Sequence, residues 1–218
     1  MTPPAAEQHG GGDRPDAVLL VGPTGAGKTP LGDALAAGGL WGRPCAHFDF
    51  GRTLRACVRG EGGAGVTPEE RAVFRRMLET DALLADEHFP VAERLFRAFV
   101  AAQAPDAHTL IVLNGLPRHV GQAERMAHLV RMRAVVHLKC SEEAVRARVR
   151  RDTGGDRGDR DDDAPARLRR KLAVYREQTE PLLAYYRERG AAILPLQVGA
   201  ETTADAMRAE LERRQGAT

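Results

Sequence analysis

Residues 17–29 read Ala-Val-Leu-Leu-Val-Gly-Pro-Thr-Gly-Ala-Gly-Lys-Thr, which is a short apolar run followed by a glycine-rich loop. Four residues separate Gly22 from Gly27, and Lys28 and Thr29 follow, as in a phosphate-binding loop (P-loop) between a strand and a helix. The small residues let backbone N–H groups surround a polyphosphate, and the positive end of the following helix favours negative charge. The stretch therefore predicts a nucleoside triphosphate site.

The chemistry of this loop assigns a task to each part of it. We expect Lys28 to reach the β- and γ-phosphates and the Thr29 hydroxyl to ligate Mg²⁺ directly. The residues that we expect to bind ATP here are Gly22, Pro23, Thr24, Gly25, Ala26, Gly27, Lys28 and Thr29. A glycine-rich turn that binds no ligand is the alternative, and the fit of the strand, the lysine and the threonine together disfavours it.

Outward from this loop, short apolar runs alternate with helical patterns. The runs that we expect to form strands are 17–21, 45–48, 109–113, 134–138 and 192–196. Short buried runs that are separated by helices indicate a parallel sheet with helices on both faces. The expected fold is therefore an α/β three-layer sandwich of the P-loop NTPase type with a five-stranded parallel sheet.

Capping residues and glycines mark the expected helices. The first helix should run from Lys28 to about Ala37, and Thr67-Pro68-Glu69-Glu70 is a capping box that should start another. Three further helices are expected, over residues 121–131, 165–190 and about 203–214.

Composition narrows the class of protein. The chain has 218 residues and a formal net charge of +2, which favours one domain and gives no reason to expect a nucleic-acid or membrane partner. Its three cysteines are scattered singly, which argues against a disulfide framework and suits a reducing compartment. Residues 1–16 are rich in Pro and Gly and predict a disordered tail, followed by a single domain over 17–218. We expect a cytoplasmic monomer.

A second segment of interest follows the third apolar run and reads Asn114-Gly115-Leu116-Pro117-Arg118, with Gln122 four residues later. Ligands of open parallel sheets bind beyond the carboxyl ends of the strands, so Arg118 should lie at the same edge as the P-loop. A guanidinium there can hold two phosphate oxygens, and Gln122 offers a donor and acceptors to a base edge. Taken alone, the segment fits a turn with an exposed arginine equally well.

A third segment, residues 146–171, interleaves many arginines with aspartates around a short Gly-rich stretch. Interleaved acids do not suit a nucleic-acid surface, so this stretch is either a solvated face or a phosphate clamp. Next to a P-loop, we expect it to form a mobile lid over the triphosphate, because the transferred phosphoryl group needs charge neutralisation and exclusion of water.

In this order, the three segments resemble those of adenylate kinase and related nucleoside monophosphate kinases, and the likeness covers nearly all of the chain from Ala17 onward. The segments that carry it are 49–56, 83–87, 114–122, 160–163 and 175–186. The resemblance implies Mg²⁺-dependent phosphoryl transfer from ATP to a nucleoside monophosphate, with AMP favoured because Gln122 is present. It also implies a monophosphate-binding segment at about 49–90 and a short lid at about 149–164.

The resemblance assigns residues to these roles. The residues implied for the monophosphate are Arg55, Leu84, Gly115, Arg118, Gln122, Arg160 and Lys171. The residues implied for catalysis are Lys28, Arg118, Arg148 and Arg160, and Arg148 is implied for ATP as well.

The chain departs from the family pattern at several positions. Asn114 replaces the aspartate that holds a Mg²⁺-bound water, so we expect it to act on the metal through water. Lys171 stands where a lid arginine is expected, and it offers a point charge without the bidentate fork. Asp49 ends the second apolar run, and we hypothesise that it replaces the charge missing at Asn114.

These departures keep two alternatives open. One is a P-loop transferase that acts on another small acceptor or on a tRNA base, since the Gly-Pro-Thr-Gly-x-Gly-Lys-Thr spelling also resembles the start of tRNA prenyltransferases. The other is a catalytically weak nucleotide-binding sensor, which Asn114 and Lys171 motivate.

Overall fold

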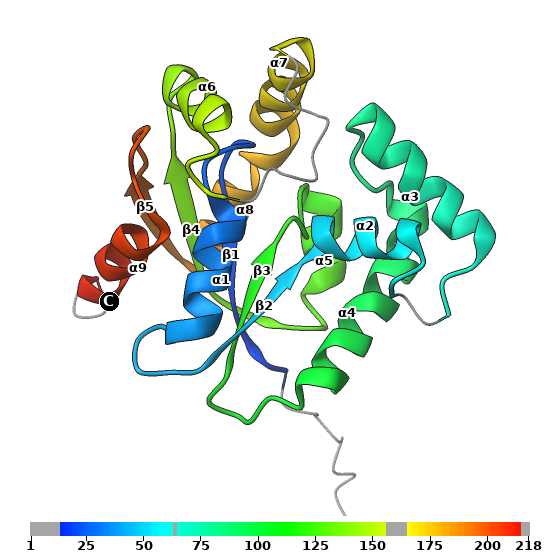
Figure 1. Ribbon diagram of the computed structural model, residues 1–218. Coiled ribbons are helices and arrows are strands. Elements are labelled where there is room, and N and C mark those ends of the chain that lie inside the picture. Colours follow the sequence, from blue (N-terminus) through cyan, green and yellow to red (C-terminus); the bar gives the residue numbers. More distant parts are fainter. Residues whose placement is uncertain (1–13, 63–64, 156–164, 215–218) are drawn as a thin grey trace, which may run out of the picture.

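Figure 1 shows the computed structural model, which describes residues 14–62, 65–155 and 165–214. Its centre is a five-stranded, all-parallel sheet with the strand order β2-β3-β1-β4-β5. The strands are β1 (Asp16–Val21), β2 (Cys45–Asp49), β3 (Leu110–Asn114), β4 (Arg131–Lys139) and β5 (Ala192–Gln197). All five expected strands are confirmed, with boundaries that differ by one to three residues.

Helices cover both faces of the sheet because the central strand β1 is apolar on both sides. Val18 and Leu20 point to one face and pack with α1 (Lys28–Gly38) and α9 (Ala204–Arg213). Leu19 points to the opposite face, as the alternation along a strand requires. The helices that pack on this face are α4 (Phe89–Gln103), α5 (Val120–Met126) and α8 (Leu182–Glu188), and the same core continues into the helical segment after β2 through Phe50, Leu54, Cys57 and Phe74. The three-layer α/β sandwich is confirmed.

The remaining helices lie beyond the carboxyl ends of the strands. On one side are α2 (Phe50–Arg59) and α3 (Pro68–Thr80), and on the other are α6 (Glu142–Arg151) and α7 (Pro165–Val174) (Figure 1). A 3₁₀ turn, Asp86–His88, leads into α4. The ends of β1, β2 and β3 therefore face a space that has helices on both sides.

Helix starts follow the capping signals. Thr67 Oγ1 accepts a hydrogen bond from the Glu70 N–H, and the Glu70 carboxylate accepts one from the Thr67 N–H, so the expected capping box is formed. Thr203 caps α9 with a single hydrogen bond, which its Oγ1 accepts from the Ala206 N–H.

Two expected helices were wrong in extent. The helix expected over 121–131 ends at Met126, because the backbone N–H of Arg131 already donates to the carbonyl of Pro15 and starts β4. The helix expected over 165–190 is interrupted by a π-helical turn, Tyr175–Thr179, before α8 begins after Pro181. Proline lacks an N–H and its ring clashes with the preceding turn, so it breaks a regular helix here.

The first strand begins one residue earlier than expected, at Asp16, which we had assigned to the tail. This carboxylate is 6% exposed and accepts hydrogen bonds from Arg43 at 2.9 Å, Arg131 at 2.6 Å and Arg133 at 2.9 Å. Burial raises its pKa, but these three arginines outweigh that effect and lower the pKa of Asp16 to about 2. The ionised carboxylate therefore connects the beginnings of β1 and β4 with the loop that precedes β2.

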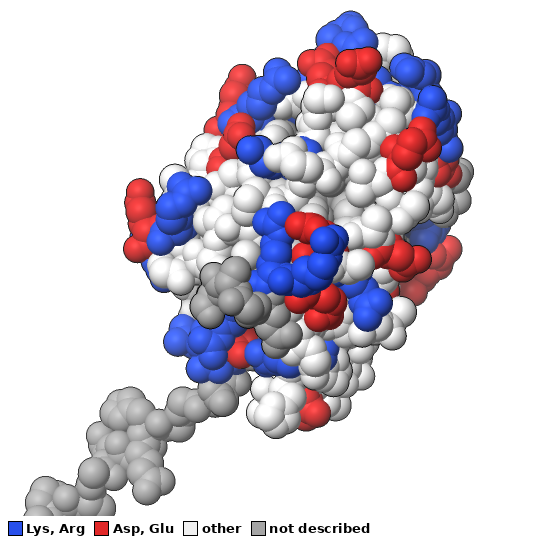
Figure 2. Space-filling view, turned by 90° about the vertical axis from the view of Figure 1, so that its left-hand side faces the viewer, with Lys and Arg blue, Asp and Glu red and all other residues white. Residues whose placement is uncertain are grey.

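On the face shown in Figure 2, Lys and Arg side chains lie interspersed with Asp and Glu rather than gathered in one field. This face therefore presents no extended basic surface of the kind that binds nucleic acid. Among the helices of the described residues, none combines the length and the apolar character that crossing a membrane requires.

Candidate active site

A pocket lies at the carboxyl edge of the sheet, between the P-loop and the helices that follow β2. It is lined by the P-loop, the ends of β2 and β3, α2, the end of α3 and the 165–179 segment. The P-loop residues in its wall are Gly22, Thr24, Gly25, Gly27, Lys28 and Thr29. Pro23 and Ala26, which we also expected at the ATP, do not line it, and Ala26 is fully buried in the core under α1.

The P-loop encloses its own lysine. Lys28 Nζ donates to the carbonyl oxygens of Gly22 at 2.7 Å and Pro23 at 2.6 Å, so its ammonium group lies over the start of the loop. Gly25 and Gly27 have φ of 77° and 92°, a region that side chains rarely adopt. A Cβ at Gly27 would also lie 2.9 Å from Arg148 Nη2, so both backbone conformation and space require glycine there.

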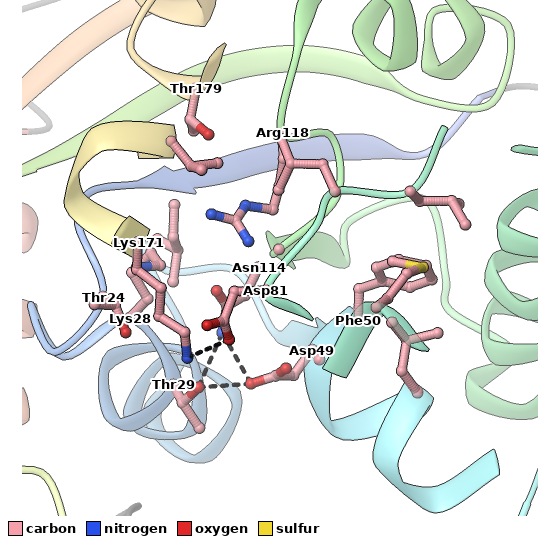
Figure 3. A pocket seen from close by; sticks show the side chains of 18 of the residues that line it. Thr24, Lys28, Thr29, Asp49, Phe50, Asp81, Asn114, Arg118, Lys171 and Thr179 are labelled. Atoms are coloured by element: carbon pink, nitrogen blue, oxygen red, sulfur yellow. Dashed lines mark hydrogen bonds and ion pairs between the residues drawn. The ribbon is translucent and has the colours of Figure 1, made fainter. Parts of the chain in front are cut away.

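Three buried polar side chains meet at the foot of the pocket. Thr29 Oγ1 donates to Asp49 Oδ2 at 2.6 Å, and Asn114 Nδ2 donates to the same carboxylate oxygen at 2.9 Å and to Thr29 Oγ1 at 3.1 Å (Figure 3). They come from α1, β2 and β3, whose ends converge at this edge. Hydroxyl and carboxylate oxygens are ligands that suit Mg²⁺, so this cluster fits the metal expected beside a triphosphate.

Arg118 and Gln122 occupy the opposite part of the pocket wall. Gln122 is 1% exposed; its Oε1 accepts from the Arg118 backbone N–H at 2.7 Å, and its Nε2 donates to the Leu84 carbonyl at 2.8 Å. Each bond uses one of two available positions, so one N–H and one lone pair of the amide stay available. His119 accepts from the Gln122 backbone N–H and caps α5.

The Arg118 guanidinium points into the pocket (Figure 3). Burial lowers the pKa of Arg118 to about 10, while the nearby Asp81 carboxylate acts in the opposite direction. At neutral pH the group remains a cation, and a desolvated one, which strengthens its attraction for a phosphate.

The other residues that we expected at the monophosphate also line this pocket. They are Arg55, Leu84, Gly115 and Lys171. Gly115 has φ of 83° at the turn that directly follows β3. Arg160 and residues 156–164 of the expected lid lie outside the described residues. The apolar wall is formed by Phe50, Leu54, Met77, Leu78, Leu83 and Val174.

Arg148 has a different position from that of Arg118. It is 3% exposed, and its guanidinium donates to the carbonyl oxygens of Gly25 at 3.1 Å, Gly199 at 2.9 Å and Thr202 at 2.7 Å. These bonds connect α6 to the P-loop and to the turn before α9. Arg148 does not line the pocket, so in this arrangement it supports the P-loop from behind.

The sequence is similar to curated adenylate kinases. The adenylate kinase of Methylobacterium radiotolerans is 33% identical over 184 residues, which cover 79% of this chain and 84% of that protein. That of Agrobacterium fabrum is 33% identical over 187 residues, which cover 81% and 87%. The chain belongs to the adenylate kinase family. It is a P-loop kinase, a phosphotransferase that binds nucleotides.

Two further comparisons concern the fold. A gluconokinase from Sinorhizobium meliloti matches with a TM-score of 0.54 at 18% identity, over 93% of this chain and 95% of that one. A shikimate kinase from Acinetobacter baumannii, solved with shikimate, matches with a TM-score of 0.50 at 21% identity, over 94% and 96%. These likenesses show the P-loop kinase fold. No family model matches the sequence.

Two pocket residues of this adenylate kinase family member had no expected role. Asp81 follows α3 with φ of 60°, and its carboxylate accepts from Arg167 at 2.8 Å and pairs with Lys171 at 3.3 Å. Burial raises the pKa of Asp81, but Arg167 and Lys171 outweigh this effect and hold the pKa below its usual value, so the carboxylate is ionised. No sequence pattern indicated this role, because Asp81 and Arg167 are far apart in the chain and meet only in the folded structure.

The second is Thr179, in the π-helical turn. It is 5% exposed and lines the pocket, and its Oγ1 has no hydrogen-bond partner among the described residues. Single π turns inside helices are often found at functional sites, because they shift a side chain out of helical register. The likeness of 175–186 to the family helix was the one signal that this segment matters.

Proposed function

We propose that this kinase transfers the γ-phosphoryl group of ATP to a nucleoside monophosphate, with AMP favoured, in a Mg²⁺-dependent reaction. The observation that carries the proposal is that Lys28 and Thr29 of the P-loop line the same pocket as Arg55, Arg118 and Gln122. A donor phosphate at the first group and an acceptor phosphate at the second would face each other across one pocket.

The expected reaction is a direct displacement. An oxygen of the acceptor phosphate forms a bond to the γ-phosphorus, and the bond between that phosphorus and the β,γ-bridging oxygen breaks, so that ADP leaves with the electron pair. No protein nucleophile is required, and catalysis consists of positioning and charge neutralisation.

The residues of the pocket divide this work. Lys28 and the P-loop N–H groups hold the β- and γ-phosphates, and Arg118 and Arg55 hold the acceptor phosphate. Lys171 contributes a further positive charge to the same wall. Arg160 remains a candidate for closing over the transferred group, as the resemblance implies.

Thr29 and Asn114 would hold Mg²⁺, directly and through a water molecule respectively. When bound there, the metal would neutralise charge that develops on the donor phosphates. The buried cluster of Thr29, Asp49 and Asn114 supports this assignment, because its oxygens match the ligand preference of Mg²⁺.

The preference for AMP rests on the acceptor side of the pocket. The apolar wall suits a planar base, and the unused N–H and lone pair of Gln122 can meet the edge of an adenine. The names of the relatives point to the same acceptor.

The experiment is an acceptor panel. The protein is incubated with ATP, Mg²⁺ and one of AMP, CMP, UMP, GMP, gluconate or shikimate, and ADP and the phosphorylated product are separated by chromatography. We expect product with AMP in excess over the other monophosphates, and none with the two hydroxy acids. Product from a hydroxy acid, or from no monophosphate, would contradict the proposal.

A further inference from the structure

We propose that Asp49, at the end of β2, supplies the negative charge on the metal side of the site that the neutral Asn114 does not supply. This inference rests on the proposed use of Mg·ATP. In the family pattern an aspartate stands at the position of Asn114, at the end of β3. In this chain the negative charge lies instead on Asp49, at the end of the neighbouring strand β2.

The register of the sheet places the two residues side by side. Asp49 and Asn114 are direct partners in the parallel pairing of β2 with β3. Neighbouring strands are about 4.8 Å apart, so an acid on either strand can reach the same space at the sheet edge. The hydrogen bond of 2.9 Å between Asn114 Nδ2 and Asp49 Oδ2 shows that both side chains turn toward it.

Asp49 also acts on the residue that is expected to touch the metal. Thr29 Oγ1 donates its hydrogen bond to Asp49 Oδ2 at 2.6 Å and accepts one from Asn114 Nδ2 at 3.1 Å, which leaves one lone pair of this hydroxyl available to a cation (Figure 3). A hydroxyl that donates to a carboxylate is a better oxygen ligand than one that donates to a neutral group.

Within the part of the chain that the structure describes, the charge of Asp49 has no ion-pair partner. The side chain of Arg52, three residues later, pairs instead with Asp33 at 2.7 Å, and no lysine or arginine of the described residues forms an ion pair with Asp49. Asp49 is 7% exposed. A buried carboxylate without a cation is costly, and a bound Mg²⁺ would offset that cost.

The second acid of the pocket is already neutralised. Asp81 pairs with Arg167 and Lys171, so its charge serves those two cations. Asp49 is therefore the acid in the pocket wall whose charge is available to a metal.

The cap of α2 does not by itself require a carboxylate at this position. Asp49 caps α2 by accepting the Arg52 backbone N–H at 2.9 Å through Oδ1. Asparagine is an equally good residue for this capping position. Asp49→Asn therefore keeps the cap and the size of the side chain and removes the charge, although its NH2 group replaces the oxygen that accepts from Thr29 and Asn114. In the swap, an aspartate at position 114 can accept from this NH2 group.

The test measures how much Mg²⁺ strengthens nucleotide binding, with no turnover. The affinity for the non-hydrolysable analogue adenosine 5′-(β,γ-imido)triphosphate is determined by calorimetry, once with Mg²⁺ and once with EDTA. The variants are Asp49→Asn, the swap Asp49→Asn/Asn114→Asp, and the control Asp33→Asn, which removes an acid of α1 that does not line the pocket. Thermal unfolding verifies that each variant is folded.

We expect Asp49→Asn to lose about tenfold or more of the strengthening by Mg²⁺, with binding in EDTA unchanged, a loss of about 1.4 kcal/mol. The swap should restore most of it, and Asp33→Asn should behave like the wild type. An unchanged Mg²⁺ effect in Asp49→Asn, an equal loss in EDTA, or a folded swap as weak as the single variant would each overturn the role of Asp49. A wild-type protein that binds no triphosphate at all would overturn the proposed function as well.

Discussion

The side-chain Oε1 of Gln122 accepts a hydrogen bond from the backbone N–H of Arg118 at 2.7 Å, so the residue expected at the acceptor base also fixes the turn that carries the acceptor arginine. Through Nε2 the same amide holds the Leu84 carbonyl at 2.8 Å. The residues proposed for the base and for the phosphate of the acceptor are thus joined by one buried amide.

Replacement of Gln122 by Ala should therefore have two effects. It leaves the Arg118 N–H without its side-chain partner and the Leu84 carbonyl with only the longer contact to His119 Nε2 at 3.3 Å, which should lower the free energy of unfolding by about 1–3 kcal/mol. It should also raise the KM for AMP and reduce the preference for AMP over CMP, UMP and GMP. Chemical denaturation and the acceptor panel measure the two effects, and Gln103→Ala on the exposed end of α4 serves as the control.

Arg118 should be indispensable for transfer. Arg118→Ala removes the guanidinium from the pocket and should lower kcat/KM by about 10³-fold, as for other arginines of phosphoryl-transfer sites. Arg118→Lys keeps a charge without the bidentate fork and should retain an intermediate rate. Lys28→Ala should abolish measurable transfer in the same assay. Near-normal rates in Arg118→Ala, with Arg125→Ala on the surface of α5 as the control, would exclude Arg118 from the mechanism.

Arg148 should affect stability and ATP affinity together. Arg148→Ala removes three hydrogen bonds of a buried guanidinium, including the one to Gly25 in the P-loop, and leaves the Gly199 carbonyl with only the Thr202 N–H at 3.4 Å. We therefore expect a loss of about 3 kcal/mol or more of unfolding free energy and weaker ATP binding. Arg146→Ala, two residues earlier, removes a surface pair with Glu142 and should cost less than about 1 kcal/mol. If Arg148→Ala kept its stability and lost only catalytic rate, the supporting role would be wrong.

The Asp16 cluster predicts a dependence of stability on pH. Because the pKa of Asp16 is lowered to about 2 in the folded chain, the ionised form stabilises the protein above the ordinary pKa of 3.8, and this contribution is lost as the pH falls toward 2. Asp16→Asn should therefore cost about 2 kcal/mol at pH 7, and the difference from the wild type should shrink between pH 4 and pH 2. Urea unfolding at several pH values measures it, and a constant difference would rule out the charge as the cause.

Local sequence patterns predicted the parts of this protein that depend on local chemistry. The apolar run before Gly22, the loop spacing and the Thr67 capping box specify β1, the P-loop and the start of α3, because neighbouring residues decide each of them. The location of the site at the carboxyl edge of the sheet could also be predicted, because the ends of parallel strands meet there.

Tertiary contacts decide what the sequence did not predict. The helix after Gly121 ends at Met126 because the next residues are needed to begin β4 beside β1. The side chain of Asp81 is held at the pocket by an ion pair with Arg167 of α7, a residue far from it in the sequence. No local pattern encodes such a pairing, and none distinguishes an arginine that binds phosphate from one that, like Arg148, supports the loop.

The most direct test of the central claim uses ADP as the only nucleotide. A kinase that joins a triphosphate site to an AMP site must also run in reverse, so purified protein given ADP and Mg²⁺ should convert it to equal amounts of ATP and AMP. Lys28→Ala should prevent this conversion, and Arg118→Ala should slow it by about 10³-fold. If the folded wild-type protein leaves ADP unchanged, the claim that the pocket transfers a phosphoryl group between ATP and AMP is contradicted.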